Sequence, residues 1–383
     1  MRILHTSDWH LGRSFHREDL LGAQGAFIDH LVETVRAESV DAVVVAGDIY
    51  DRALPPVDAV QLASEALHRL AAERVRVVLS SGNHDSAHRL GFAADLIDAA
   101  GIHLRTDPES AGRPVLLEDV HGPVAIYAIP YLEPDLVREP WRLPERTHSA
   151  SLGEAMHRVR RDLATRPVQT RSLVMSHAFV TGGQSSDSER DISVGGVSQV
   201  GVKLYDGVDY VALGHLHGRQ QVLPHVRYSG SPLAYSFSEA GHHKGSWLVD
   251  LDGSGVDVVE FVPAPVPRGL AMLRGRLDVL LQDPRHAAVE EHWLHITLTD
   301  PVRPAEAMPR LRGRFPHALV LSFEPEGQGS DRTGSWATRV EGRSDGEIVR
   351  EFVTDVRGEP PDAEEAALLQ GACDACRLED GAA

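Results

Sequence analysis

Five short groups of Asp, Asn and His residues each follow an apolar run in this sequence. They are Asp8 with His10, Asp48 after Gly47, Asn83-His84-Asp85 after Gly82, His177, and His215 with His217. Carboxylate, amide and imidazole side chains bind divalent metals, and a set rich in carboxylate and imidazole suits manganese, iron or zinc better than calcium. One such group alone is most often a turn or a surface feature, but the five together predict a metal centre.

The spacing of these groups favours a centre that holds two cations. Residues i and i+2 of an extended segment point to the same side, so each Asp-x-His or His-x-His pair directs two ligands into one pocket. A carboxylate such as Asp48 can bridge two cations, whereas the side chains of Asn83 and His177 bind one each. Two cations about 3.5–4 Å apart hold a hydroxide and stabilise in-line displacement at a phosphoryl group. The expected chemistry is therefore hydrolysis of a phosphate ester.

Two residues of the third group have other expected roles. His84 adjoins a ligand and is not needed as one, so we expect it to donate to the leaving oxygen. Asp85 is expected to orient the ring of His84 from outside the ligand set. Both are therefore candidate catalytic residues.

The apolar runs before these groups predict strands that position the ligands. Strands over 2–8, 43–48 and 75–80 alternate with helices over 20–37 and 57–72. This β-α-β-α-β order predicts a parallel sheet covered by helices, with ligands at the carboxyl ends of its strands. The apolar positions of the 20–37 helix either cover this sheet or form a dimer interface.

Shorter strands in the second half of the same region predict a second sheet. They cover residues 114–117, 124–129, 172–176, 210–213, 226–232 and 245–251, with the last two expected to be antiparallel. A further helix is expected near 152–163, and a long polar loop over 181–199 is expected on the functional face. The predicted fold class is α/β, a two-sheet αββα sandwich that spans residues 1–265.

The segment Pro263-Ala264-Pro265-Val266-Pro267 predicts a linker and a domain boundary. Strands over 270–277, 293–298 and 318–323 with two short helices predict a small α+β domain at 268–326. After a polar linker at 327–335, a tail at 343–383 is expected to form helices over 347–357 and 362–375. The apolar stripe of Ile348, Phe352 and Val356 packs either on this chain or on a partner.

Composition limits the class of protein. The net charge of −18 argues against a general basic nucleic-acid clamp, although two bound divalent cations would offset acid at the metal face. Only Cys373 and Cys376 are present, so no disulfide framework is expected; they form half a zinc site or are simply two small helix residues. No apolar run reaches the ~20 residues of a membrane span, and a cytoplasmic location is expected.

The ordered motifs resemble those of the calcineurin-like metallophosphoesterases. The opening Met-Arg-Ile-Leu-His-Thr-Ser-Asp-Trp-His-Leu-Gly, Tyr228-Ser-Gly-Ser-Pro232 and Ser236-Phe237-Ser238-Glu239 are similar to the SbcD family, the nuclease subunits of bacterial SbcCD complexes. The resemblance is strong over residues 1–265 and lies mainly in layout beyond them. The linker and the acidic end have no firm match, which leaves the docking contacts open.

The resemblance implies a manganese-dependent DNA nuclease that acts in repair and recombination. Such enzymes degrade double-stranded ends 3′ to 5′ and nick hairpins or blocked ends, as a homodimer with SbcC, a coiled-coil ATPase, in the cytoplasm at the nucleoid. By motif, one manganese ion takes Asp8, His10, Asp48 and His217, and the other takes Asp48, Asn83, His177 and His215. The 268–326 domain corresponds to a cap over DNA, and the tail corresponds to the segment that docks SbcC.

Two other functions remain open at this point. A phosphatase or phosphodiesterase for smaller substrates uses the same fold, and Asp51-Arg52 superficially fits one. However, Ala53 follows Arg52, and Asp85 stands where such phosphatases carry Glu. A scaffold with a silent site is the weaker alternative, because no ligand is missing.

Overall fold

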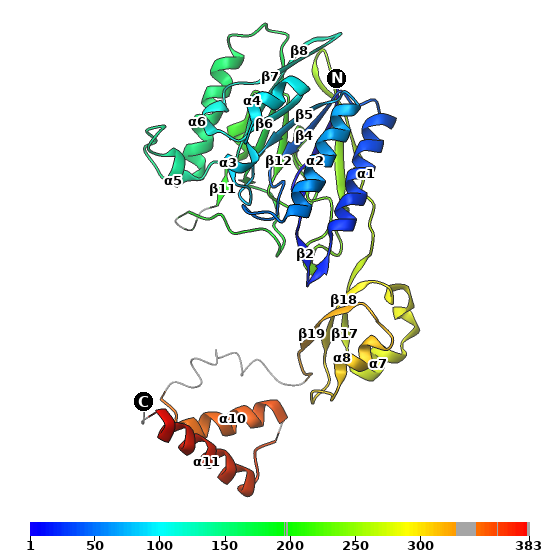
Figure 1. Ribbon diagram of the computed structural model, residues 1–383, viewed down its shortest axis with the longest axis vertical. Coiled ribbons are helices and arrows are strands. Elements are labelled where there is room, and N and C mark those ends of the chain that lie inside the picture. The colour runs from blue at the N-terminus through cyan, green and yellow to red at the C-terminus, as the bar shows by residue number, and fades with distance from the viewer. Residues whose placement is uncertain (195, 197, 327–341, 358, 381–383) are drawn as a thin grey trace. The chain divides into compact units, whose positions relative to one another are not determined.

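The computed structural model describes residues 1–194, 196, 198–326, 342–357 and 359–380. The chain divides into two compact units, Met1–Pro267 and Arg268–Ala383 (Figure 1). The polar linker predicted at 327–335 lies outside the described residues. No helix of the described residues combines the length and apolar character needed to cross a bilayer.

The first sheet of the first unit has six strands in the order β16-β15-β1-β4-β5-β6. Their bounds are β16 (Gly255–Pro263), β15 (Gly245–Asp252), β1 (Arg2–Thr6), β4 (Ala42–Ala46), β5 (Arg76–Ser80) and β6 (Ile102–Arg105). The four strands β1, β4, β5 and β6 run parallel, and β15 joins β1 in the antiparallel sense. The predicted β-α-β-α-β order is confirmed.

The second sheet has six strands in the order β13-β14-β12-β9-β8-β7. Their bounds are β13 (Gln220–Leu223), β14 (Val226–Tyr228), β12 (Tyr210–Gly214), β9 (Arg171–His177), β8 (Gly122–Ile129) and β7 (Val115–Asp119). The strand β14 is antiparallel to β13 but parallel to β12, so the prediction of an antiparallel strand at 226–232 holds for one neighbour only. The antiparallel strand predicted at 245–251 is confirmed, and it returns to the first sheet as β15.

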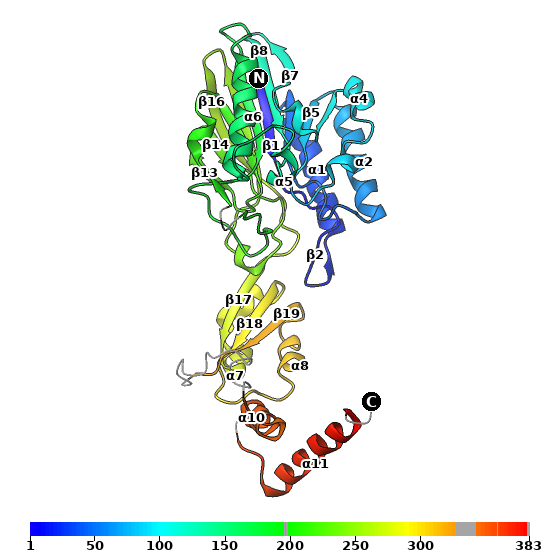
Figure 2. The ribbon, with the colours of Figure 1, turned by 90° about the vertical axis from the view of Figure 1, so that its left-hand side faces the viewer.

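The helices of the first unit lie outside the two sheets (Figures 1 and 2). They are α1 (Leu21–Ala37), α2 (Val57–Ala72), α3 (Ala87–Leu90), α4 (Ala94–Ile97), α5 (Pro134–Val137) and α6 (His148–Leu163). Short two-stranded ribbons pair β2 (Ser14–Phe15) with β3 (Glu18–Asp19), and β10 (Phe179–Val180) with β11 (Gln199–Val200). Short 3-10 turns cover Asp98–Ala100, Pro108–Ser110, Val202–Tyr205, Phe237–Glu239 and Pro284–Val289.

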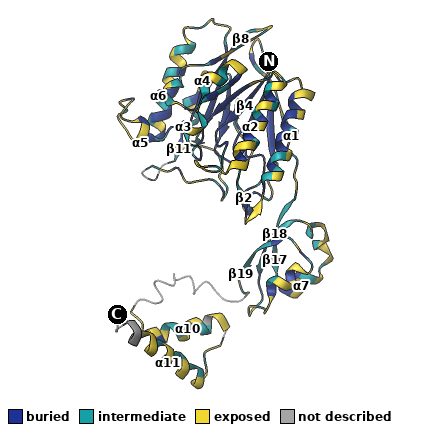
Figure 3. Cartoon of the chain, viewed as in Figure 1, coloured by how far each residue is buried: buried dark blue, intermediate teal, exposed yellow. Residues whose placement is uncertain are grey.

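Three apolar layers hold these parts together, because alternate residues of a strand face opposite sides of its sheet. In β4, Val43 and Val45 pack against α1 and α2, whereas Val44 packs between the two sheets with Met175 of β9. The helix α6 covers the other face of the second sheet through a third core that includes Met156. The strands are accordingly buried while the outer helix faces are exposed (Figure 3). This is the expected αββα sandwich.

The helix α1 settles an alternative that the sequence left open. Its apolar positions Phe27, Leu31 and Val35 are each at most 3% exposed and belong to the core against the first sheet. They therefore cover the sheet and are not part of a dimer interface.

The second unit begins with a small parallel sheet of β17 (Leu270–Gly275), β18 (Trp293–Leu298) and β19 (Ala318–Phe323). The helices α7 (Leu277–Gln282) and α8 (Ala307–Arg312) pack on it through a separate core. Farther along, α10 (Asp345–Arg357) contacts α11 (Ala363–Asp380). Cys373 and Cys376 lie on α11, the first half-buried and the second exposed.

Candidate metal centre

The carboxyl ends of strands from both sheets meet at one edge of the sandwich. The amides of Asp8 and His10, after β1, donate to the carbonyls of Gly47 (3.1 Å) and Asp48 (3.0 Å), after β4. The amide of His215, after β12 of the second sheet, donates to Asp8 Oδ1 at 3.0 Å. The structure brings together all seven residues that the sequence predicts as ligands: Asp8, His10, Asp48, Asn83, His177, His215 and His217. All of them are buried except Asn83, which is half-buried.

One group of ligand atoms gathers around Asp8, His10 and His217. One oxygen or nitrogen from each lies within 4.8 Å of the others. The Nε2 atoms of His10 and His217 are 3.0 Å apart. Two imidazole nitrogens at this separation can both bind one cation, because metal–nitrogen bonds of about 2.0–2.1 Å reach a common point between them.

A second group gathers around the side-chain oxygen of Asn83. This Oδ1 lies 2.9 Å from His177 Nε2 and 3.2 Å from His215 Nδ1. The Oδ2 of Asp48 lies 3.4 Å from His177 Nε2 and 3.6 Å from His10 Nε2, so this carboxylate stands between the two groups. That is the position a bridging ligand requires.

The backbone at the site is strained where it turns the ligands inward. Asp8, His10, Asp48 and His215 all have positive φ angles, between 45° and 98°. L-residues with side chains adopt this region at a cost of order 1–3 kcal/mol each, and such residues gather at functional sites. The repeated glycines have a steric reason, since a Cβ on Gly82 would lie 2.1 Å from Asp48 Oδ1 and one on Gly47 2.2 Å from His177 Nδ1.

Hydrogen bonds fix the orientation of several of these groups. His177 Nδ1 donates to the carbonyl of Ala46 at 2.9 Å, which directs Nε2 toward Asn83 and Asp48. The amide of His84 donates to Asp48 Oδ1 at 2.9 Å. The remaining Asp48 oxygen, Oδ2, is the one that faces the imidazoles.

Burial and mutual charge shift the titration of the site. Burial lowers the pKa of His177, but the carboxylates of Asp48 and Asp8 outweigh it and raise that pKa to about 9. Burial raises the pKa of Asp8 to about 6. Burial holds the pKa values of His10 and His215 well below the ordinary value. A proton on His177 therefore offsets the negative charge of the two buried carboxylates. Bound cations would offset that charge in its place.

The residues present fit two divalent cations. His10 Nε2 and His217 Nε2 face each other at 3.0 Å, and His177 Nε2 and His215 Nδ1 both face Asn83 Oδ1. Buried carboxylates such as those beside them are normally paired or coordinate a metal. The mixed carboxylate, amide and imidazole set suits manganese, iron or zinc.

The structure corrects the role expected of Asp85. Its carboxylate accepts from the amides of Ile49, Tyr50 and Gly82 at 2.9–3.1 Å. Asp85 therefore joins the segment after Asp48 to the segment before Asn83, and it does not orient the imidazole of His84. The ring of His84 is held instead by the carbonyl of Asp51, to which Nδ1 donates at 2.7 Å. Burial lowers the pKa of His84.

Several residues that support the site carry no local sequence signal. Gln24 of α1 donates to the carbonyl of His10 at 2.9 Å. The ring of Tyr235 lies edge-on to those of His10 and His217, and its hydroxyl donates to the carbonyl of Trp9 at 2.6 Å. These contacts join residues far apart in the sequence, so only the fold reveals them.

Comparisons with known proteins agree with this geometry. Residues 266–357 match the model described as the Type 5 capsule protein repressor C-terminal domain (SbcD_C), and residues 1–219 match that of the calcineurin-like phosphoesterases. Together the two matches support the SbcD-type resemblance of the sequence.

Two solved structures are also similar to this chain, with low sequence identity and low TM-scores. Protein TT1561 of Thermus thermophilus is 11% identical with a TM-score of 0.39, and 68% of this chain aligns with 98% of that one. A structure titled as a novel archaeal phosphodiesterase is 13% identical with a TM-score of 0.30, covering 69% and 99%. Neither score is high enough to carry an argument. The family match, in contrast, spans more than half of the chain, and this protein therefore belongs to the calcineurin-like phosphoesterases, metal-binding hydrolases that act on phosphoester bonds.

Proposed function

We propose that this protein is a manganese-dependent DNA nuclease of the SbcD type. It would degrade double-stranded ends 3′ to 5′ and cut hairpins or blocked ends during repair and recombination. The observation that carries the proposal is the joint presence of a complete seven-residue ligand cluster and an SbcD_C domain at residues 266–357. A phosphatase function accounts for the first feature but not for the second.

The chain's own residues have distinct tasks in this reaction. Two manganese ions, held by the sets around His217 and around Asn83 with Asp48 between them, would supply a hydroxide and neutralise charge on the phosphoryl oxygens. His84 stands beside both sets with its ring 4.7 Å from that of His10. Because Nδ1–H is committed to the Asp51 carbonyl, Nε2 would give a proton to the leaving oxygen from the imidazolium form of His84, which burial opposes and the neighbouring carboxylates of Asp48 and Asp51 favour.

The second unit supports the proposed partner. The helix α10 contacts α11, yet Val356 of its apolar stripe and Leu368 of α11 remain 60% and 70% exposed. An apolar helix face of this kind fits a groove on another protein. We assign the tail to docking an SbcC-type coiled-coil ATPase, and the sheet domain of β17, β18 and β19 to capping DNA.

The first unit supports a homodimer. Large apolar side chains are exposed just before α2 and in its first turn, between α3 and α4, and on α4: Leu54 (68%), Val57 (70%), Val60 (43%), Phe92 (80%) and Leu96 (80%). Arg89 donates to the carbonyl of Ala53 at 3.1 Å and so joins these segments. An apolar patch on a charged protein marks an interaction surface, and a second copy of the same patch would cover it.

The proposal is tested with a 5′- or 3′-labelled linear duplex and manganese, with and without an SbcC-type partner and ATP. An aryl phosphate is the parallel substrate. We expect duplex degradation from the ends and little turnover of the aryl phosphate. Rapid aryl phosphate hydrolysis with intact DNA, even with partner and ATP, would replace the nuclease with a phosphatase.

A further inference from the structure

His217 is held at three separate atoms by side chains from other segments. Its amide donates to Oε1 of Glu189 at 2.7 Å, and its carbonyl accepts from Nζ of Lys244 at 2.8 Å. Its ring Nδ1 lies 2.5 Å from the hydroxyl of Ser188. By contrast, the ring nitrogens Nδ1 of His177 and His84 are held by main-chain carbonyls. His217 thus depends on residues that substitution can remove.

Ser188 connects the imidazole to a buried ion pair. Its hydroxyl lies 2.5 Å from Oε1 of Glu239, and the other oxygen of Glu239 pairs with Lys244. Glu239 and Lys244 are 1% and 6% exposed. Lys244 also donates to Ser231 Oγ at 3.0 Å, so its three N–H groups are all used. Burying such a pair is costly unless the geometry is good and the remaining donors are satisfied.

The hydrogen bonds from His217 through Ser188 to Glu239 determine which ring nitrogen of His217 carries the proton. A serine hydroxyl has one proton, and the Glu239 carboxylate accepts it. The Ser188 oxygen must then accept from His217 Nδ1, which makes Nδ1 the protonated ring nitrogen. The unprotonated Nε2 faces His10 Nε2 at 3.0 Å, inside the ligand cluster.

We propose that Ser188, Glu239 and Lys244 form a positioning relay that sets the tautomer and direction of His217 for the cation it shares with His10. The inference rests on the proposed function, because it takes His217 as a metal ligand. Among the hydrogen bonds of the described residues, none joins the three relay residues to the ligand atoms around Asn83, so only one of the two cation sites depends on them. Hydrogen-bond partners of metal-bound histidines are worth about 10- to 100-fold in metal affinity.

The test is a titration of the full metal-free chain with manganese. Calorimetry and the electron paramagnetic resonance signal of free Mn²⁺ measure the binding. We expect Ser188→Ala to weaken one of two manganese sites about 10- to 100-fold and to leave the other unchanged. Ser188→Thr, which keeps the hydroxyl, should restore most of the lost affinity. A Glu239→Leu/Lys244→Met variant removes the acceptor of the Ser188 proton without leaving an unpaired buried charge and should weaken the same site.

Two controls separate positioning from general damage. Ser176→Ala removes another buried serine hydroxyl next to a ligand, but that hydroxyl bonds Tyr205 at 2.9 Å, and both sites should keep wild-type affinity. In a His217→Ala background, Ser188→Ala should cause no additional loss, because the residue it serves is absent.

Two results would overturn the relay: wild-type affinity at both sites in Ser188→Ala, or equal weakening of both. Either would leave the metal centre itself standing. A wild-type chain that bound fewer than two manganese ions would instead remove the proposed function along with the relay.

Discussion

The ring Nδ1 of His84 donates to the main-chain carbonyl of Asp51 at 2.7 Å, whereas the neighbouring Asp85 makes its contacts with three backbone amides. The orientation of His84 is therefore built into the loop that follows Asp48. No side chain has to be present for the ring to be held, so a substitution at position 84 tests the ring alone.

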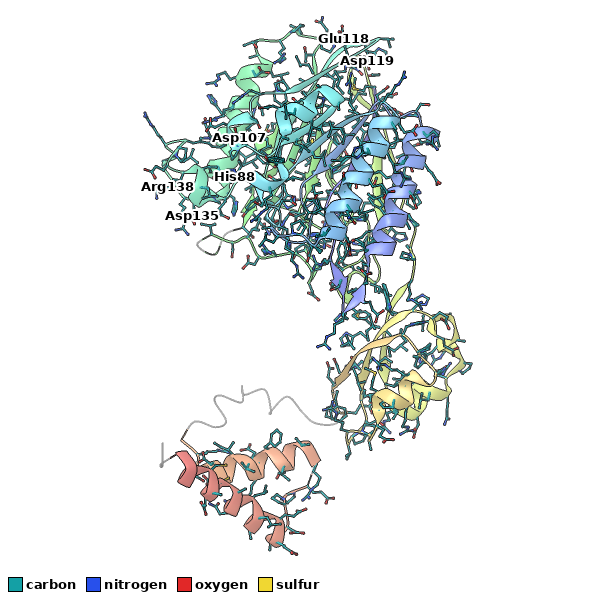
Figure 4. All side chains as sticks on the ribbon, in the orientation of Figure 1. His88, Asp107, Glu118, Asp119, Asp135 and Arg138 are labelled. Atoms are coloured by element: carbon teal, nitrogen blue, oxygen red, sulfur yellow. The ribbon has the colours of Figure 1, made fainter. Side chains whose placement is uncertain are left out.

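Replacing His84 with Gln should reduce DNA cleavage by about 100- to 10,000-fold, because general acid catalysis contributes that much. Manganese binding should persist, because the seven ligands remain. The measurement is single-turnover cleavage beside a manganese titration. The control is His88→Gln, an exposed histidine on α3 (Figure 4), which should retain wild-type rates. Loss of manganese from His84→Gln would show that this residue is a ligand instead.

Replacing His177 with Ala should remove or strongly weaken one of two bound manganese ions, because it deletes a nitrogen 2.9 Å from Asn83 Oδ1 and 3.4 Å from Asp48 Oδ2. Equilibrium dialysis with elemental analysis counts the ions per chain. His148→Ala is the matched control, since His148 is also buried but donates to the carbonyl of Ile192 and lies outside the cluster. Two ions retained by His177→Ala would refute its assignment.

The stability of the fold at acid pH should depend on the ion pair between Arg171 and Asp119. Asp119 is the last residue of β7 (Figure 4). Arg171 is buried and donates to both Asp119 oxygens, at 3.0 and 2.6 Å, and this holds the pKa of Asp119 well below its ordinary value. A carboxylate with a depressed pKa stabilises the fold above its unfolded pKa of about 3.9 and loses that contribution as the pH falls.

The free energy of unfolding of Asp119→Asn should therefore lie below that of the wild type at pH 7, and the gap should shrink below about pH 4. Breaking a fully buried ion pair costs about 3–5 kcal/mol. Because Asp119 is 16% exposed, the difference in the free energy of unfolding between the two proteins should be smaller than that. Urea unfolding at several pH values measures it, with the exposed Asp257→Asn as control. A gap independent of pH would show that the pair's charge is not the cause.

The exposed apolar patch should mediate self-association. Phe92→Glu is expected to convert a dimer to a monomer, since a central apolar anchor contributes roughly 2 kcal/mol or more and the new charges would face each other. Sedimentation equilibrium reports the mass. Val168 is at least as exposed but lies elsewhere, and Val168→Glu should leave the dimer intact. A wild-type monomer at all concentrations would contradict the homodimer.

The sequence predicted which residues gather at the site, because each one ends or follows a strand, and strand ends of a parallel sheet meet at one edge. The helix α2 was predicted at its observed bounds, Val57–Ala72, because two prolines precede it and its apolar period is clear. Three strands of the two six-stranded sheets were not predicted: β6, β13 and β16. All three lie at sheet edges, and β13 and β16 are half-buried or exposed at nearly every position, so they lack a clear apolar run.

The supporting contacts were beyond prediction for a different reason. Ser188 and Glu239 lie 51 residues apart, and both meet His217, which lies 29 residues from Ser188. No periodic pattern links such positions. The ring of His84 was expected to be oriented by the carboxylate of Asp85, but its partner is the main-chain carbonyl of Asp51. A main-chain contact of this kind has no signature in the sequence.

In the proposed nuclease, cleavage of DNA requires two metal ions at once. The most direct measurement is a manganese titration of the metal-free chain that records bound manganese and the release of nucleotides from a labelled duplex in the same samples. We predict that the cleavage rate follows occupancy of the second site and is absent in chelator. Cleavage that reaches its full rate with one ion bound, or that persists without metal, would contradict cleavage by two metal ions.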